Sequence, residues 1–134
     1  MISTLLVMIG GGFGAVVRGA LTDYCNAKFT SSLPIPTLIV NLIGSFLIGL
    51  IMGMAISNTW LSALFVTGFL GGLTTFSTLA KELTLMMTPK LKLTHFINYS
   101  LLQFIIGFIA CYIGALCQIG LMSSISEVRQ LNIA

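Results

Sequence analysis

Four long apolar stretches joined by short polar connections dominate this sequence, and they constrain its fold more than any other feature. Only 7% of the 134 residues are charged, whereas 57% are hydrophobic. A soluble domain normally has about 25% charged residues with which to cover its surface. The chain is therefore predicted to lie in a lipid bilayer, as a single all-α integral membrane domain over residues 1–134.

Turn-forming residues between the stretches set the expected helix limits. Because a spanning helix needs about 20 apolar residues, we expect helices at about 2–21, 36–56, 60–87 and 93–122. The third is expected to break at 71–78, because two glycines followed by two β-branched threonines form a poor helical sequence. Four such helices are too few to enclose a pore, so self-association or a partner chain is expected.

Polar side chains at membrane depth are the first candidates for function, since placing them in lipid is costly. Thr37, Asn41 and Ser45 recur every four residues and share one helix face. A threonine or serine hydroxyl can bond the carbonyl one turn earlier, so a structural role is the simpler interpretation for such residues. Asn41 has two donors and an acceptor, and it is expected to meet a polar partner, a subunit interface or a permeating species. Further candidates on the later stretches are Thr74, Thr75, Ser77, Thr78, Tyr99, Ser100 and Gln103.

Several functional classes lack the residues that they need. The first two predicted helices contain no acidic residue, and the only histidine, His95, lies near Lys90 and Lys92. Acid–base catalysis and proton-coupled transport therefore lack titratable groups at membrane depth. The six Lys and Arg residues form no basic run, which argues against nucleic-acid binding. Neutral hydrogen-bond donors on several helices, with almost no fixed negative charge, suit an anion or a neutral solute as ligand better than a metal ion.

Three collinear segments, followed by Glu82, resemble the Fluc (CrcB) family of fluoride channels. They read GGGFGAVVRG at 10–19, PTLIVNLIGSFLIG at 36–49 and GFLGGLTTFSTL at 68–79. The resemblance implies a four-helix subunit in the plasma membrane, paired as an antiparallel dimer with two ion pathways along its interface. It also implies passive export of fluoride, which relieves fluoride toxicity in the cytoplasm.

The resemblance further implies roles for individual residues. Asn41 and Phe76 would line the pore, and Arg18 and Glu82 would be the family's charges near the membrane ends. Fluoride is small and strongly hydrated, so a selective pore must replace its water with donors. The amide of Asn41 and the ring edge of Phe76 suit that task, as do the hydroxyls of four further pore candidates: Thr37, Ser77, Thr78 and Ser100.

A sodium ion at the dimer centre is also implied by the resemblance. The backbone carbonyls of Gly71 and Thr74 would hold it. Carbonyls freed by a broken helix are tolerable at membrane depth where something buried, such as a cation, satisfies them.

One motif position departs from the family. Leu79 stands where a second pore phenylalanine is expected, and leucine offers no positive ring edge. Positive charges are also uneven, with Lys28, Lys81, Lys90 and Lys92 at one side and Arg129 at the other. This bias predicts an outside amino terminus. It favours a heterodimer with a homologous subunit of opposite orientation over a homodimer, and Cys25, expected in a connection, would report the orientation to thiol reagents.

Three alternatives come from other classes. A non-conducting accessory subunit is consistent with Leu79. A small multidrug exporter would need an acidic residue in the first helix, and 2–21 contains none. An intramembrane enzyme would need a nucleophile and base that His95 alone cannot supply.

Overall fold

The computed structural model describes residues 1–29, 33–55, 58–87 and 93–131. Within these ranges the regular elements are helical and no strand occurs. Four spans are long and apolar enough to cross a membrane: Ile2–Lys28, Ile35–Met52, Thr59–Met86 and Leu93–Arg129. These spans confirm the prediction of an all-α chain with four membrane-crossing helices.

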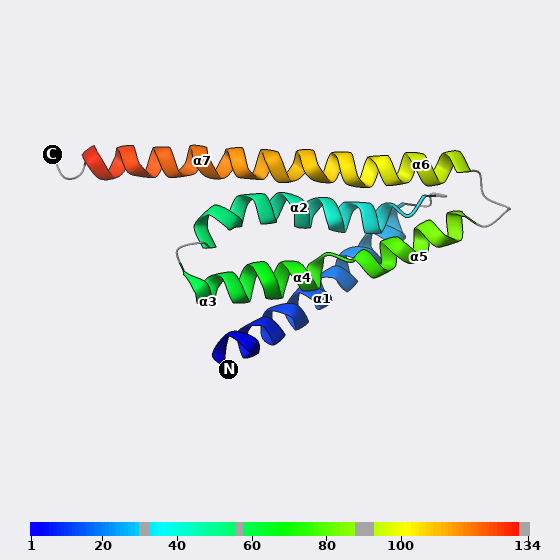
Figure 1. Cartoon of the computed structure of the whole chain (residues 1–134), viewed down its shortest axis with the longest axis horizontal. Helices are drawn as coiled ribbons and strands as arrows, with labels where there is room; N and C mark the ends of the chain where they lie inside the picture. Colours follow the sequence, from blue (N-terminus) through cyan, green and yellow to red (C-terminus); the bar gives the residue numbers. More distant parts are fainter. Residues whose placement is uncertain (30–32, 56–57, 88–92, 132–134) are drawn as a thin grey trace.

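The spans run back and forth, so that the start of the first span and the end of the fourth lie toward the same end of the molecule (Figure 1). The first is α1 (Ile2–Lys28) and the second is α2 (Ile35–Ala55). The third consists of α3 (Thr59–Leu61), π-helical η1 (Ser62–Leu70), α4 (Gly71–Leu73) and α5 (Phe76–Met86). The fourth is one long rod that consists of α6 (Leu93–Leu101), π-helical η2 (Leu102–Ile106) and α7 (Gly107–Leu131). We call the end at which the first span begins and the fourth span ends the terminal end, and the opposite end the connection end.

The first and last spans are longer than their apolar stretches predict. Helix α1 continues to Lys28 instead of ending near 21, and α7 continues to Leu131 instead of ending near 122. The end of α1 is closed by a 2.8 Å hydrogen bond from the Phe29 amide to the Cys25 carbonyl. Cys25 therefore lies inside the helix, only 4% exposed, and not in a connection as predicted. Its thiol is a poor reporter of orientation for this reason.

Glycines bring α2 and α7 into backbone contact. A Cβ atom on Gly49 would overlap the carbonyl oxygen of Cys111, and one on Gly114 would overlap that of Phe46. Helices in lipid associate through close packing of this kind, because lipid offers no hydrophobic drive to bring them together.

Two small groups of buried side chains form the core. One joins α2 to the third span through Val40, Leu70 and Leu73. The other, at the connection end, consists of Leu79, Met86 and Tyr99. The backbone between these groups is extended at Thr74, with ψ 154°, and at Thr75, with φ −141° and ψ 108°. Helix α5 begins immediately afterwards, so its polar first turn lies between the two core groups.

Candidate functional site

A groove of about 450 Å³ opens beside the two extended residues, between α2, α5, η2 and α7. We call it the central groove. Its polar lining comes from Asn41, Ser45, Thr74, Thr75 and Gln103, and its apolar lining from Ile48, Phe76, Leu79, Phe104, Gly107, Phe108 and Cys111. No residue in this lining carries a formal charge. The groove therefore offers dipoles and aromatic rings to whatever enters it.

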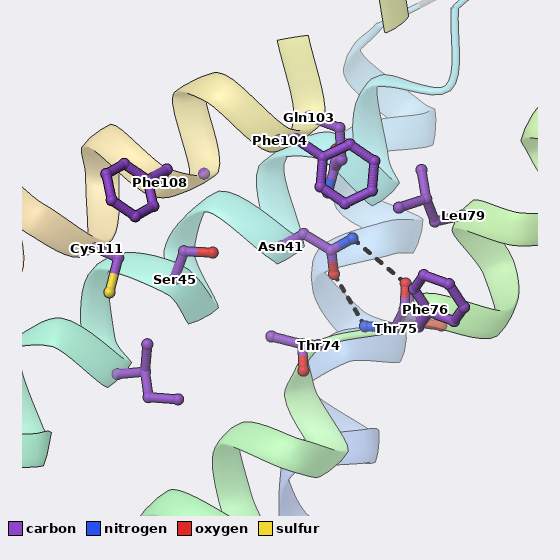
Figure 2. Close-up of a pocket in the computed structure, with 12 residues that line it drawn as sticks. Asn41, Ser45, Thr74, Thr75, Phe76, Leu79, Gln103, Phe104, Phe108 and Cys111 are labelled. Carbon is purple, nitrogen blue, oxygen red and sulfur yellow. Dashed lines mark hydrogen bonds between the residues drawn. The ribbon is translucent and has the colours of Figure 1, made fainter. Parts of the chain in front are cut away.

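Asn41 bridges α2 to the extended residue Thr75 with both ends of its amide (Figure 2). The Asn41 Oδ1 atom accepts from the Thr75 amide at 2.9 Å, and Asn41 Nδ2 donates to the Thr75 carbonyl at 3.3 Å. An extended residue inside a span has no helical partners for these backbone groups, and leaving them unpaired is costly. Asn41 therefore supplies the partners, and one N–H of its amide remains for another acceptor.

The polar start of α5 is stabilised by Thr75. Its Oγ1 accepts from the Thr78 amide at 3.3 Å, which caps the helix, and donates to Thr78 Oγ1 at 2.8 Å. Ser77 Oγ lies 3.5 Å from the same Thr75 oxygen. Ser77 and Thr78 are both exposed, and neither lines the central groove.

Arg18 approaches the extended segment from α1. Its Nη1 atom donates to the Thr74 carbonyl at 3.5 Å, and Thr74 Oγ1 donates back to the Leu70 carbonyl at 2.9 Å. Gly71 lies one turn earlier on the exposed surface of this span. Its backbone can be approached closely, since no atom lies within 4 Å of the position that a Cβ would take.

Glu82 accepts hydrogen bonds from two hydroxyls near the connection end. Thr37 Oγ1 donates to Glu82 Oε1 at 2.5 Å, and Tyr99 Oη donates to Glu82 Oε2 at 3.0 Å. Thr37, Thr78 and Glu82 line a second cavity of about 660 Å³, which also includes His95. The structure thus separates Thr37 and Thr78 from Asn41 and Phe76, because the two pairs line different cavities.

Of the polar candidates Ser100 and Gln103 on the fourth span, only Gln103 lines the groove. Ser100 lies outside the groove lining, and its buried Oγ has no hydrogen-bond partner. Gln103 and Phe104 line the groove instead, beside Asn41. The spacing of four residues from Tyr99 to Gln103 is the sequence signal for this face, since both side chains are buried.

Leu79 lines the groove from its buried side. It is only 3% exposed and packs with Met86 and Tyr99, whereas Phe76 is 74% exposed. The rings that line the groove are Phe76 from α5, Phe104 from η2 and Phe108 from α7. The structure therefore contains aromatic rings on two walls of the groove even with leucine at position 79.

The sequence profile of one protein family matches residues 5–115, and that family is described as "CrcB-like protein, Camphor Resistance (CrcB)". The chain belongs to the CrcB family. Two relatives from Staphylococcus aureus are 77% identical to it over 114 residues, which are 85% of this chain and 97% of each relative. The relative from strain Mu50 is named "Fluoride-specific ion channel FluC 2", and that from strain USA300 "Fluoride-specific ion channel FluC".

The CrcB match extends across the whole candidate site. It includes Arg18, Asn41, Glu82 and both walls of the central groove, and it ends at residue 115, inside α7. Together with the four spans, family membership establishes a multi-pass membrane protein and confirms the resemblance that the sequence motifs indicated.

Proposed function

We propose that this CrcB chain is a subunit of a fluoride-selective channel that lets fluoride leave the cell passively and so relieves its toxicity. The observation that carries the proposal is the uncharged lining of the central groove, which combines amides, hydroxyls and aromatic rings. Neutral donors can replace the water of a small anion without holding it as tightly as a fixed positive charge would. Relatives at 77% identity are named fluoride-specific ion channels, which supports the same function.

The proposed channel is a dimer whose subunits run antiparallel. Phe76 is 74% exposed and Phe108 is 76% exposed, so the groove is open along one side of a single subunit. A second subunit would cover these rings and convert an open groove into an enclosed path. Enclosure matters because an ion is stabilised by dipoles only where bulk water and lipid are both kept away.

A sodium ion at the centre of the dimer is part of the proposal. Gly71 and Thr74 would hold it through their backbone carbonyls, which are neutral oxygen donors. The Gly71 carbonyl lacks its usual helical donor, because the amide of Thr75 bonds Asn41 instead. When bound, the ion would supply positive charge that pairs these carbonyls across the interface. Replacing sodium by a large organic cation should then lower the thermal stability of the dimer in detergent.

The proposed orientation has the amino terminus outside. The described cations Lys28 and Lys81 belong to the connection end, and Arg129 belongs to the terminal end. Positive residues favour the cytoplasmic side. A chain with a fixed orientation would need a homologous partner of opposite orientation, so a heterodimer is the assembly we favour.

A non-conducting accessory subunit is the second candidate. Leu79 favours it, because this buried leucine stands where the family motif is expected to have a second phenylalanine, so α5 brings one ring to the groove instead of two. An accessory subunit predicts no fluoride flux even when every candidate partner chain is supplied.

The deciding experiment is fluoride efflux from liposomes that contain the purified protein, alone and then co-expressed with a homologous chain. We expect fast fluoride release and no chloride release in at least one of these preparations. Absence of fluoride release in every preparation would remove the proposed function. Release from the lone chain would support the channel and exclude an obligate partner.

A further inference from the structure

The two amide side chains of the central groove differ in how they are anchored. Asn41 uses both its oxygen and its nitrogen on the backbone of Thr75. Gln103 is only 6% exposed, yet its Oε1 atom is buried without a hydrogen-bond partner. Among the groove residues that the structure describes, Gln103 therefore has the amide that is least committed to the protein.

An unpaired buried amide is costly for a protein to keep. An acceptor that gives up water without gaining a partner costs free energy, while an apolar side chain of similar shape at that position would avoid the cost. No residue that the structure describes repays the cost at Gln103 Oε1. Water that enters the groove can repay it by donating to Oε1, whereas an anion is itself an acceptor and can bond only the NH₂ group of the same amide. The residue lines the same space as Asn41 and Phe76.

The local backbone also sets Gln103 apart. It lies in η2, the π-helical stretch Leu102–Ile106 that interrupts the fourth span. Single π turns inside α-helices are rare and are frequent at functional sites. Gln103 and Phe104 of this turn both line the groove, next to Asn41 in Figure 2.

We propose that Gln103 hydrogen-bonds the permeating fluoride and is a specificity-determining residue of the pathway. Its NH₂ group donates to the anion, and its Oε1 accepts from water that accompanies the ion. Because the amide is not fixed at either end by a described residue, it can turn as the ion passes. Asn41, whose amide bonds Thr75 at both ends, keeps the backbone of the extended segment in place while the Gln103 amide turns. The inference rests on the proposed channel function.

The test compares Gln103→Leu with Gln118→Leu in reconstituted protein, in the preparation that conducts. Gln118 is the control position, because the same glutamine-to-leucine change there falls in α7 and outside the groove lining. Gln103→Leu should reduce fluoride release roughly tenfold or more, the effect of one lost hydrogen bond to a charged group. Gln118→Leu should release fluoride at the rate of the unaltered protein. Gln103→Asn, which keeps an amide, should recover part of the flux.

Thermal unfolding of the same variants separates a pathway role from a structural one. Gln103→Leu should be at least as stable as the unaltered protein, because it removes an unpaired buried group. A destabilised Gln103→Leu dimer whose flux loss follows its unfolding would overturn the inference, since the amide would then have a partner across the subunit interface. Unchanged flux and selectivity in Gln103→Leu would overturn it as well. A protein without fluoride flux in any preparation would instead remove the proposed function, and this inference with it.

Discussion

Asn41 shows how a polar residue in a membrane span can act on backbone instead of on other side chains. Its amide pairs with both the N–H and the C=O of Thr75, which would otherwise lack partners in the extended segment. Those two bonds fix the point at which α5 begins, one residue later at Phe76. A single side chain on α2 therefore determines where an aromatic ring of the groove is placed.

Asn41→Leu removes both bonds while keeping a side chain of similar size. We expect it to lower the free energy of unfolding by about 2–4 kcal/mol, since two backbone groups lose their partners, and to abolish fluoride flux. Asn41→Asp keeps the acceptor for the Thr75 amide, so it should be more stable than Asn41→Leu, but its negative charge should still repel the anion. The control Asn98→Leu changes an exposed asparagine of α6 and should alter neither property. Detergent unfolding curves and liposome efflux measure the two effects, and wild-type flux in Asn41→Asp would contradict this account.

Thr37 stabilises Glu82 through a 2.5 Å hydrogen bond between spans that are far apart in sequence. Thr37→Val has nearly the same shape and removes only the hydroxyl. We expect a loss of about 1–3 kcal/mol in unfolding free energy, because Tyr99 is then the one side chain in the described ranges that donates to Glu82. Thr84→Val is the matched control, because its hydroxyl is exposed and bonds the Ala80 carbonyl of its own helix. Equal stability of the two variants in thermal unfolding would show that the Thr37 bond contributes nothing.

Sequence spacing identified the polar residues but not their partners. The four-residue spacing placed Thr37 and Asn41 on one face of α2. Thr37 nevertheless bonds Glu82 of α5, which also accepts from Tyr99 of α6, whereas Asn41 bonds the backbone of Thr75. Such pairings depend on how the spans pack, which periodicity within one helix does not contain. Spacing likewise left Ser100 and Gln103 as candidates on neighbouring faces of the fourth span, and which of the two lines the groove depends on the same packing.

At the scale of elements, the apolar pattern predicted the four spans better than it predicted their ends. Hydropathy reports the thickness of the bilayer core, about 30 Å, and not the length of the helix that crosses it. Helix α1 therefore continues through the polar residues Asp23 and Asn26 as far as Lys28. The two π-helical stretches were not predicted either, since their sequences SALFVTGFL and LQFII are as apolar as ordinary helical ones.

The contact between α2 and α7 depends on glycine at position 49. Gly49→Ala adds a Cβ that would overlap the Cys111 carbonyl, so the helices must separate. We expect a destabilisation of about 1–3 kcal/mol together with reduced flux, because α2 and α7 both line the central groove. Gly12→Ala provides the comparison, since a Cβ there meets no atom within 4 Å and alanine favours helix by up to about 1 kcal/mol. If thermal unfolding places both variants at the same midpoint, the close approach of α2 and α7 has no energetic importance.

At the scale of the whole molecule, the subunit presents a largely apolar exterior with charge at its ends. Val16, Phe76 and Phe108 are each more than 70% exposed in the single chain. Lipid or a second subunit must cover such rings and side chains. The charges at the two ends then decide how the subunit lies in the membrane.

Orientation can be measured with cysteines at the two ends of α1. Ser3→Cys and Ala27→Cys are exposed sites near the terminal and connection ends, in a background without the three native cysteines. A membrane-impermeant thiol reagent added to whole cells should label Ser3→Cys fully and leave Ala27→Cys unlabelled, because the lysines of the connection end favour the cytoplasmic side. Permeabilised cells provide the control for reactivity. Labelling of about half of each population would show dual orientation and would favour the homodimer.

The length of the fourth span has a consequence for how the protein meets its surroundings. A helix of 37 residues, Leu93–Arg129, is about 55 Å long, whereas a bilayer with its headgroups is about 40–45 Å thick. At the average tilt of about 20° the rod still spans about 52 Å, so its last turns lie in water when its first residues are level with the opposite headgroups. A reporter domain fused after them would be held clear of the lipid and of the helix packing.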